Sequence, residues 1–410
     1  MKNILWKKPL DYQYLFLDMN AYFASIEQQI HPQFRKKPLV VTPTPCPTGC
    51  IVTASYEARS YGIKTGMTIR EAQSLYPKII IRSSDTFLYL KFHQKLLEII
   101  KNITPFYYVK SIDELAIKLT PQDQNYQKSI NFALKIKYFI KKYLGDHIRC
   151  SIGIAPNIFL AKMAAESKKP DGLTVLKKSN LKKFFSKLQL TDLCGIAHRM
   201  ANNLQIININ SPLDFFSTDI QKLKSQLGKI GEYWYLNLHG YDTKQTTIHI
   251  PAKTVSQSHV LEPKLRNWDS AWSVCEKLIF KAARRLRSNK QITKKILLKT
   301  NFTGGNKYKN WIKISPTNDS FTLTKYIKLI WKLIPKYTNI PLKINISFFD
   351  LSPSNPRQNK LFYDNKKHQS LSDSIDKINH RFSHNTIYPA NTLQAQDSAP
   401  DRISFGQPKF

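Results

Sequence analysis

The N-terminal part of the chain contains a short apolar run, residues 14–17, that ends directly in an acid, Asp18. A run of this length bounded by polar residues is typical of a buried strand. Apolar side chains then recur at helical spacing, which predicts a helix from Met19 to Gln29. The chain is therefore expected to contain a sheet in which one buried strand presents a carboxylate at its C-terminal edge.

Strand and helix patterns continue to alternate up to about residue 155. Further strands are predicted at residues 39–41, 50–54, 109–119 and 148–154, and helices at 56–60 and 132–143. Gly62 should end the first of these helices, and the apolar face of the second must pack on the sheet. The alternation predicts an α+β sheet with helices on one face.

The rest of the chain shows three other patterns. Residues 181–240 contain short helical segments broken by glycines, which indicate a separate small helical domain. Residues 254–351 follow the order β-α-β-β-α-β, with a hairpin at Gly304 and Gly305, and predict a four-stranded sheet with two helices. The polar tail beyond residue 351 is expected to be only partly ordered. The 410 residues suit two to four domains of ~100–200 residues each.

Basic residues greatly outnumber acidic ones, since 63 Lys and Arg against 28 Asp and Glu give a net charge of +35. Such an excess suits a polyanionic partner, most commonly nucleic acid. Binding to a membrane surface is the competing interpretation, but the basic residues are spread along the chain. On the predicted strand after Gly305, Lys307, Lys309, Trp311 and Lys313 share one face, which favours phosphate contact over a merely solvated face.

The cysteines and the hydropathy bear on the compartment. The chain has no run of about 18 apolar residues, and its five cysteines are scattered. Both features favour a soluble, cytoplasmic protein with no membrane insertion and no disulfide framework. Cys46 and Cys50 lie close together, but no neighbouring residue completes a tetrahedral zinc set.

Acidic residues are scarce, so Asp18 and the adjacent pair Asp113 and Glu114 stand out beside apolar strand residues. Neighbouring side chains of a regular strand point to opposite faces, so the pair can act together only where the strand bends or begins a hairpin. Carboxylates gathered at one sheet edge repel each other unless hard cations lie between them. Mg²⁺ is the natural ion for oxygen ligands that face phosphates.

Six segments carry a resemblance to a known family. They are residues 18–27, 53–67, 111–114, 151–157, 161–164 and 169–172. In order and spacing they resemble the motifs of the Y-family translesion DNA polymerases, in the DinB or DNA polymerase IV-like branch. The resemblance implies a right-hand polymerase of the following parts: palm and fingers in residues 1–180 (fingers about 21–82), a thumb with a helix-hairpin-helix in 181–245, a linker at 246–253, a little finger at 254–351 and a tail at 352–410.

The resemblance also implies roles for single residues. Two Mg²⁺ ions, for which Mn²⁺ can substitute, would be bound by Asp18, Asp113, Glu114 and the carbonyl of Met19. The nucleotide-binding residues would be Tyr22, Phe23, Thr53, Tyr56, Arg59 and Lys169. Phe23 corresponds to the aromatic steric gate that excludes ribonucleotides, although a Phe on an amphipathic helix is also typical of a core.

Contacts to DNA and to a sliding clamp are implied further along. The DNA-binding residues would be Gly195 and Ala197 in the thumb hairpin and Lys307, Lys309 and Lys313 in the little finger. Ala197 replaces the usual second glycine of the hairpin, which could hinder close approach of the backbone to a phosphate. In the tail, Gln358, Leu361 and Phe362 fit the Q-x-x-L-F pattern that binds the bacterial sliding clamp, and a plain polar linker is the alternative.

The family implies an error-prone, monomeric DNA polymerase that extends a primer past damaged template bases from deoxynucleoside triphosphates and lacks a proofreading exonuclease. Asn20 stands where most polymerase IV sequences carry Asp; Asn also occurs there in the mutasome branch, so that branch stays open. Two alternatives come from other classes: a catalytically silent DNA-binding relative and a two-metal phosphodiester hydrolase.

Overall fold

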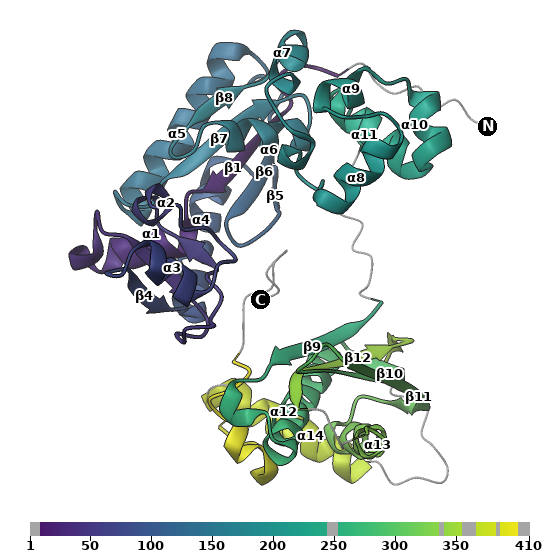
Figure 1. Ribbon diagram of the computed structural model, residues 1–410. Coiled ribbons are helices and arrows are strands. Elements are labelled where there is room, and N and C mark those ends of the chain that lie inside the picture. Colours follow the sequence, from purple (N-terminus) through teal and green to yellow (C-terminus); the bar gives the residue numbers. More distant parts are fainter. Residues whose placement is uncertain (1–8, 244–252, 336–339, 355–365, 383–385, 401–410) are drawn as a thin grey trace. The chain divides into compact units, whose positions relative to one another are not determined.

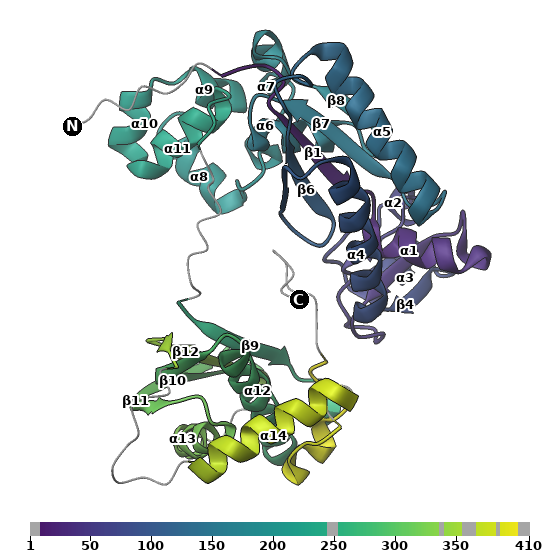
Figure 2. The same cartoon turned by 180° about the vertical axis from the view of Figure 1, so that it is seen from behind.

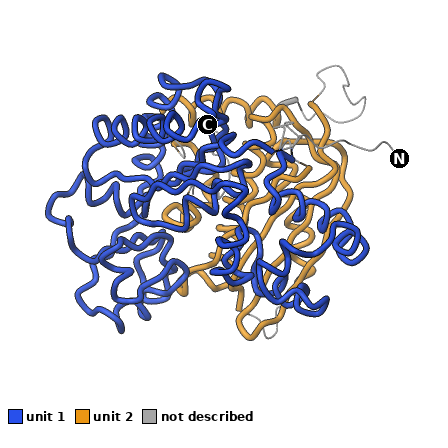
Figure 3. The backbone as a smooth tube through the Cα atoms, turned by 90° about the horizontal axis from the view of Figure 1, so that it is seen from above, with its two compact units in different colours: residues 1–246, 402–410 blue, residues 247–401 orange. Residues whose placement is uncertain are grey.

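The computed structural model describes residues 9–243, 253–335, 340–354, 366–382 and 386–400. The chain divides into two compact units, residues 1–246 with 402–410 and residues 247–401 (Figure 3). Each unit has its own buried apolar core. In the described ranges, no helix combines the length and the apolar character that crossing a bilayer requires.

A five-stranded sheet forms the centre of the first unit. From edge to edge its strands are β5 (Tyr107–Val109), β6 (Glu114–Lys118), β1 (Tyr14–Met19), β7 (Cys150–Ala155) and β8 (Leu173–Val175). β1 runs antiparallel to both β6 and β7, while β7 and β8 are parallel. The apolar run that ends in Asp18 is therefore the central strand.

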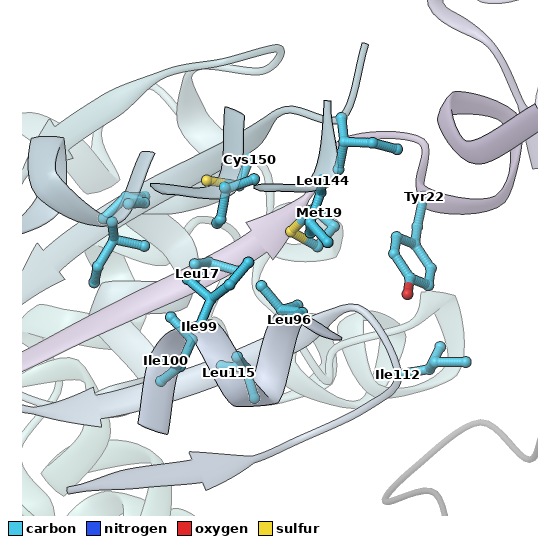
Figure 4. Close-up of a cluster of buried hydrophobic side chains, with 14 of the residues drawn as sticks. Leu17, Met19, Tyr22, Leu96, Ile99, Ile100, Ile112, Leu115, Leu144 and Cys150 are labelled. Carbon is cyan, nitrogen blue, oxygen red and sulfur yellow. The ribbon is translucent and has the colours of Figure 1, made fainter. Parts of the chain in front are cut away.

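Helices cover both faces of this sheet, so the prediction of helices on one face is wrong. They are α4 (Thr86–Ile103) and α5 (Tyr126–Leu144) on one face and α6 (Ile158–Ser167) on the other (Figure 1). Every residue of β1 is buried, because its side chains alternate between two cores. Leu17 and Met19 pack with Leu96 of α4 (Figure 4), whereas Tyr14 and Phe16 pack with α6.

A smaller three-stranded sheet with three helices occupies much of residues 21–83. Its strands are β3 (Thr53–Ala54), β2 (Leu39–Thr42) and β4 (Ile80–Ser83), and the helices are α1 (Tyr22–Ile30), α2 (Tyr56–Ser60) and α3 (Ile69–Leu75). α1 begins three residues later than predicted, because Met19 still belongs to β1 and Ala21 adopts a left-handed conformation with φ 43°. The strand predicted at 50–54 is shorter, because Cys50 forms only an isolated bridge with Thr68.

Short helices follow β8, as predicted for residues 181–240. They are α7 (Leu181–Phe185), α8 (His198–Ile206), α9 (Pro212–Ser217), α10 (Ile220–Leu227) and α11 (Lys229–Leu238). Gly195 and Gly228 have φ of +99° and +62°, so they supply the left-handed turns before α8 and α11.

The second unit confirms the predicted β-α-β-β-α-β order. Its elements are β9 (Val255–Val260), α12 (Trp268–Ser288), β10 (Gln291–Phe302), β11 (Lys307–Thr317), α13 (Ser320–Lys332) and β12 (Pro341–Phe349). The sheet has the order β11-β10-β12-β9, and the short β13 (Ser352–Pro353) pairs with β10. Both helices contribute to one core with the sheet.

The tail contains more regular structure than its composition indicated. α14 (Lys366–Phe382) and the 3-10 helix η5 (Ala390–Ala395) pack on α13 and α12 (Figure 2). The ammonium of Lys277 in α12 donates to the carbonyls of Ala395, Gln396 and Ser398 at 3.0, 2.7 and 2.8 Å. Lys277 is consequently only 5% exposed.

Changing Lys277 to alanine should destabilise the second unit. The change removes the donor for three carbonyls, and each buried polar group left unsatisfied costs about 1–3 kcal/mol. Urea unfolding should therefore show a loss of roughly 3 kcal/mol, while Lys325→Ala, an exposed residue of α13, should change stability by less than about 0.5 kcal/mol. Equal midpoints for the two variants would contradict this account of the tail.

Candidate active site

Backbone pairing brings the three predicted acids together. Asp18 lies directly opposite Glu114 in the register of β1 and β6. The Met19 N–H donates to the carbonyl of Asp113 at 2.9 Å, which fixes Asp113 beside the end of β1. β5 and β6 form an antiparallel hairpin with residues 110–113 in its turn, so Asp113 and Glu114 stand at a bend of the kind that the sequence required.

Each of the two paired acids holds a lysine. Lys169 Nζ lies 2.8 Å from Asp18 Oδ2, and Lys162 Nζ, from α6, lies 2.6 Å from Glu114 Oε1. Asp18 is only 6% exposed, and burial raises its pKa to about 6 against the opposing effect of Lys169. Burial also raises the pKa of Asp113. The site therefore combines a buried carboxylate, Asp18, with the half-buried carboxylates of Asp113 and Glu114, and it attracts positive charge.

A further carboxylate, which the sequence analysis missed, adjoins this cluster. Oxygen atoms of Asp18, Glu114 and Glu166 lie within 4.8 Å of one another. Glu166 follows Lys162 by one turn of α6, and its Oε1 is 3.9 Å from Lys162 Nζ. The signal that could have found it is this i, i+4 spacing, which places Glu166 on the side of α6 that carries Lys162. The carboxylate oxygens of these acids are suitable ligands for a divalent cation. The ammonium groups of Lys162 and Lys169 already lie beside them, which shows that positive charge is stabilised at this place.

The short helix α2 presents Tyr56 and Arg59 on one side. The Arg59 guanidinium lies 4.8 Å from the centre of the Tyr56 ring. The Tyr56 hydroxyl is buried and has no hydrogen-bond partner in the part of the chain that the structure describes. Burial raises the pKa of Tyr56, and both Asp18 and Lys169 are near enough to influence it. The Tyr56 hydroxyl, a hydrogen-bond donor, therefore lies near Asp18 of the acid cluster. Thr53, which is half-buried in β3, precedes Tyr56 by three residues.

The two aromatic residues at the start of α1 differ in exposure. Phe23 is half-buried and stacks on Tyr89, with ring centres 4.3 Å apart and planes at 14°. Tyr22 is 3% exposed and belongs to the buried apolar cluster (Figure 4). Its hydroxyl donates to the Tyr89 carbonyl at 3.0 Å. The structure thus places Tyr22 in the core, with no hydroxyl available to a nucleotide, and leaves Phe23 partly accessible.

The residues before α8 include Ala197, the position of the substituted glycine. Gly195 is exposed with φ +99°, and a Cβ there would lie 3.6 Å from ring carbons of Trp234. Ala197 is the N-cap of α8 with φ −94° and ψ 172°, an extended conformation that any residue adopts. The replacement of glycine by Ala197 therefore introduces no backbone strain.

The predicted basic face of β11 is exposed. Lys307, Lys309 and Lys313 are all exposed, and Trp311 between them is 47% exposed. Lys295 Nζ, from the neighbouring β10, lies 3.9 Å from the centre of the Trp311 ring, which adds a further cation to this face. The three residues of the clamp pattern, Gln358, Leu361 and Phe362, lie outside the described residues.

The sequence of the chain is similar to two family models and to several known proteins. Residues 17–166 match the impB/mucB/samB family, and residues 252–361 match the impB/mucB/samB family C-terminal domain. The chain is 28% identical to the DNA polymerase IV of Moorella thermoacetica over 93% of this chain and 96% of that protein. It is 30% identical to that of Clostridium perfringens strain 13, over 70% of this chain and 80% of the relative. With the DNA polymerase IV of Pelotomaculum thermopropionicum it shares 34% identity, over 56% of each chain.

A solved structure shows the same fold. It is a Y-family DNA polymerase chimera that matches with a TM-score of 0.66 and 23% identity. The match covers 82% of this chain and 98% of the chimera.

Proposed function

Because the chain belongs to the impB/mucB/samB family, in the DinB-like branch of the Y-family polymerases, we propose that Asp18, Asp113 and Glu114 form its catalytic centre. The chain is a DNA-directed DNA polymerase of the translesion type and binds template DNA. The observation that carries the assignment of the centre is the pairing of Asp18 with Glu114 across β1 and β6, with Asp113 at the adjoining bend.

Asp18 and Glu114 of this centre, together with Glu166, bring carboxylate oxygens within 4.8 Å of one another, which suits the divalent metal ions on which such polymerases depend. Two Mg²⁺ ions held by the three carboxylates and the Met19 carbonyl would lower the pKa of the primer 3′-hydroxyl and neutralise charge on the leaving pyrophosphate, and Mn²⁺ can substitute. Lys162 and Lys169 compensate part of the charge of Glu114 and Asp18.

The triphosphate is bound beside this centre by Thr53, Tyr56, Arg59 and Lys169. The unpartnered Tyr56 hydroxyl supports this proposal, because a phosphate oxygen would supply the acceptor that the chain does not. Arg59 adds a planar guanidinium, and Lys169, which lies beside Asp18, adds a point charge.

The sugar of the incoming nucleotide faces Phe23, which excludes a 2′-hydroxyl by overlap. Tyr22 acts behind it, since the two rings lie with centres 5.7 Å apart and both contact Tyr89. Tyr22 therefore contributes to nucleotide binding through the position of Phe23 rather than through its own hydroxyl.

DNA is held through its phosphates by the backbone at Gly195 and Ala197 and by the basic face of β11. Gln358, Leu361 and Phe362 would bind a sliding clamp, with the apolar pair in a pocket and the glutamine at its rim.

Neutralising the basic face should reduce the salt dependence of DNA binding. A variant with alanine at Lys307, Lys309 and Lys313 loses up to three phosphate contacts, and each contact contributes about 0.9 to the slope of log affinity against log salt. Affinity for primer-template DNA should therefore fall at low salt and its slope decrease by about 2 to 3. The control variant carries alanine at Lys325 and Lys332, exposed residues of α13, and should keep the slope of the wild type. An unchanged slope in the first variant would remove β11 from the DNA contact.

Primer extension with undamaged and damaged templates tests the function as a whole. Addition of nucleotides that requires deoxynucleoside triphosphates supports the polymerase. Shortening of the DNA without triphosphates would favour the hydrolase, and DNA binding with neither reaction would favour the silent relative.

A further inference from the structure

The turn that carries Lys169, residues 168–172, is fastened to the sheet by side chains that the proposed mechanism does not use. The turn follows α6 and leads into β8. Lys169 contacts Asp18 from this turn, so the position of its ammonium depends on how firmly the turn is held. Two residues distant in sequence, Asn20 and Lys137, make the principal contacts.

Asn20 reaches the turn from the end of β1. Its Oδ1 accepts a hydrogen bond from the Asp171 N–H at 2.7 Å, and its Nδ2 donates to Ser151 Oγ at 3.0 Å. Ser151 Oγ in turn accepts from the Gly172 N–H at 3.2 Å. Asn20 is 3% exposed, and its backbone N–H donates to the Arg149 carbonyl at 2.8 Å. Burial and this backbone contact restrict the conformations that its side-chain amide can adopt. A buried polar pair thus joins the turn to the strand that bears Asp18.

Lys137 reaches the turn from α5, on the other side of β7. Its ammonium donates to the carbonyls of Cys150 and Asp171, both at 2.8 Å, and to that of Gly172 at 3.3 Å. It also pairs with the Asp171 carboxylate, and its side chain is 17% exposed. One charged group therefore ties a strand residue and two turn residues together, with acceptors for each of its three protons.

We propose that Asn20 and Lys137 are positioning residues that hold Lys169 where the triphosphate must bind. Both act through the turn that carries Lys169. This role rests on the proposed function of Lys169. A catalytic or binding group displaced by about 1 Å can cost as much as a hundredfold in rate, so a loosened turn should weaken nucleotide binding first and leave the metal-binding acids in place.

The chemistry of Asn20 explains which substitution should be tolerated. Asn20→Asp keeps the acceptor for the Asp171 N–H, and the Ser151 hydroxyl can turn to donate to the new carboxylate. Asn20→Ala removes both contacts. The account therefore expects the two substitutions to differ, although both change the same position.

The test compares two loosening variants, Asn20→Ala and Lys137→Met, with two controls, Asn20→Asp and Lys135→Met. Lys135 is an exposed lysine on the same helix. Steady-state primer extension should show a KM for the deoxynucleoside triphosphate raised about tenfold or more in the loosening variants, with kcat within about threefold. Both controls should stay within about threefold of the wild type in both parameters.

Hydrogen exchange of the protein without substrate or metal supplies the second readout. Amides of residues 168–172 should exchange at least about tenfold faster in the loosening variants, while amides of β1 keep the wild-type rate. Unchanged exchange and unchanged KM in Lys137→Met would overturn the proposal, as would a fall of kcat alone. If the wild type itself does not extend a primer, the proposed function fails, and the exchange rates still decide whether these residues hold the turn.

Discussion

Changing Glu114 to glutamine is expected to reduce primer extension by on the order of 10³-fold or more, which corresponds to about 4 kcal/mol of transition-state stabilisation. The amide keeps the size of the side chain but removes its negative charge, so it cannot balance the positive charge of a divalent cation. The same loss is expected for Asp113→Asn, because both residues stand at the bend opposite Asp18. Single-turnover extension of a labelled primer measures the effect directly.

Binding of primer-template DNA provides the internal control for these variants. Affinity for the DNA should stay within about threefold of the wild type, since neither acid lies on a basic DNA-binding face. Glu98→Gln, an exposed acid on α4, should retain full extension. Extension by Glu114→Gln within tenfold of the wild type would place the chemistry elsewhere and remove Glu114 from the centre.

Shrinking Phe23 to valine should allow ribonucleotides to be incorporated. The valine side chain is too short to occupy the space that a 2′-hydroxyl needs, so the discrimination between the two sugars should fall by on the order of 10²-fold or more. The effect is measured as the ratio of kcat/KM for a deoxynucleotide and its ribonucleotide, on the same primer. Loss of the stack on Tyr89 should also cost some stability, which thermal unfolding will report.

Two substitutions separate the steric effect from a general loss of packing. Phe23→Tyr keeps an aromatic ring at the position and should keep the discrimination. Phe132→Val removes a half-buried ring from α5, distant in sequence from the nucleotide residues, and should lower stability without changing sugar choice. If Phe23→Val discriminates as the wild type does, Phe23 is a core residue and another group excludes the ribose.

The parts of the fold that the sequence predicted well are those specified by local pattern. Strict alternation along residues 296–314, with Gly304 and Gly305 between the alternating runs, determines a hairpin almost without reference to the rest of the chain. The central strand was predicted equally well, because a short apolar run bounded by polar residues is typical of a buried strand. The sequence did not predict that both faces of this strand are buried. Leu17 and Phe16 point into two different cores, but a run that is apolar throughout does not show which side chain lies on which face.

The sequence predicted three acids of the site and, through the family resemblance, Lys169 and Arg59, but it did not predict Glu166, Lys162 or Lys137. Asp18, Asp113 and Glu114 are unusual because acids are rare in this chain and these adjoin apolar strands. Lys162 and Lys137 look like ordinary members of a lysine-rich chain, and only the three-dimensional structure shows that one pairs with Glu114 and the other with the turn at Asp171. Such contacts join residues that are far apart in sequence, so no local spacing of residues predicts them.

The burial of Lys277 illustrates the same limit in the second unit. A lysine on an amphipathic helix is expected on the solvated side, and Lys277 would be there if the tail did not cover it. Its carbonyl partners lie more than a hundred residues further along the chain.

Anomalous diffraction from crystals grown with primer-template DNA, a non-hydrolysable deoxynucleoside triphosphate and Mn²⁺ tests the central claim most directly. Two Mn²⁺ peaks should lie between Asp18, Asp113 and Glu114, and the ammonium groups of Lys162 and Lys169 should have left those carboxylates. Peaks remote from the three acids, or lysines that still pair with them in the presence of the nucleotide and metal, would contradict the account.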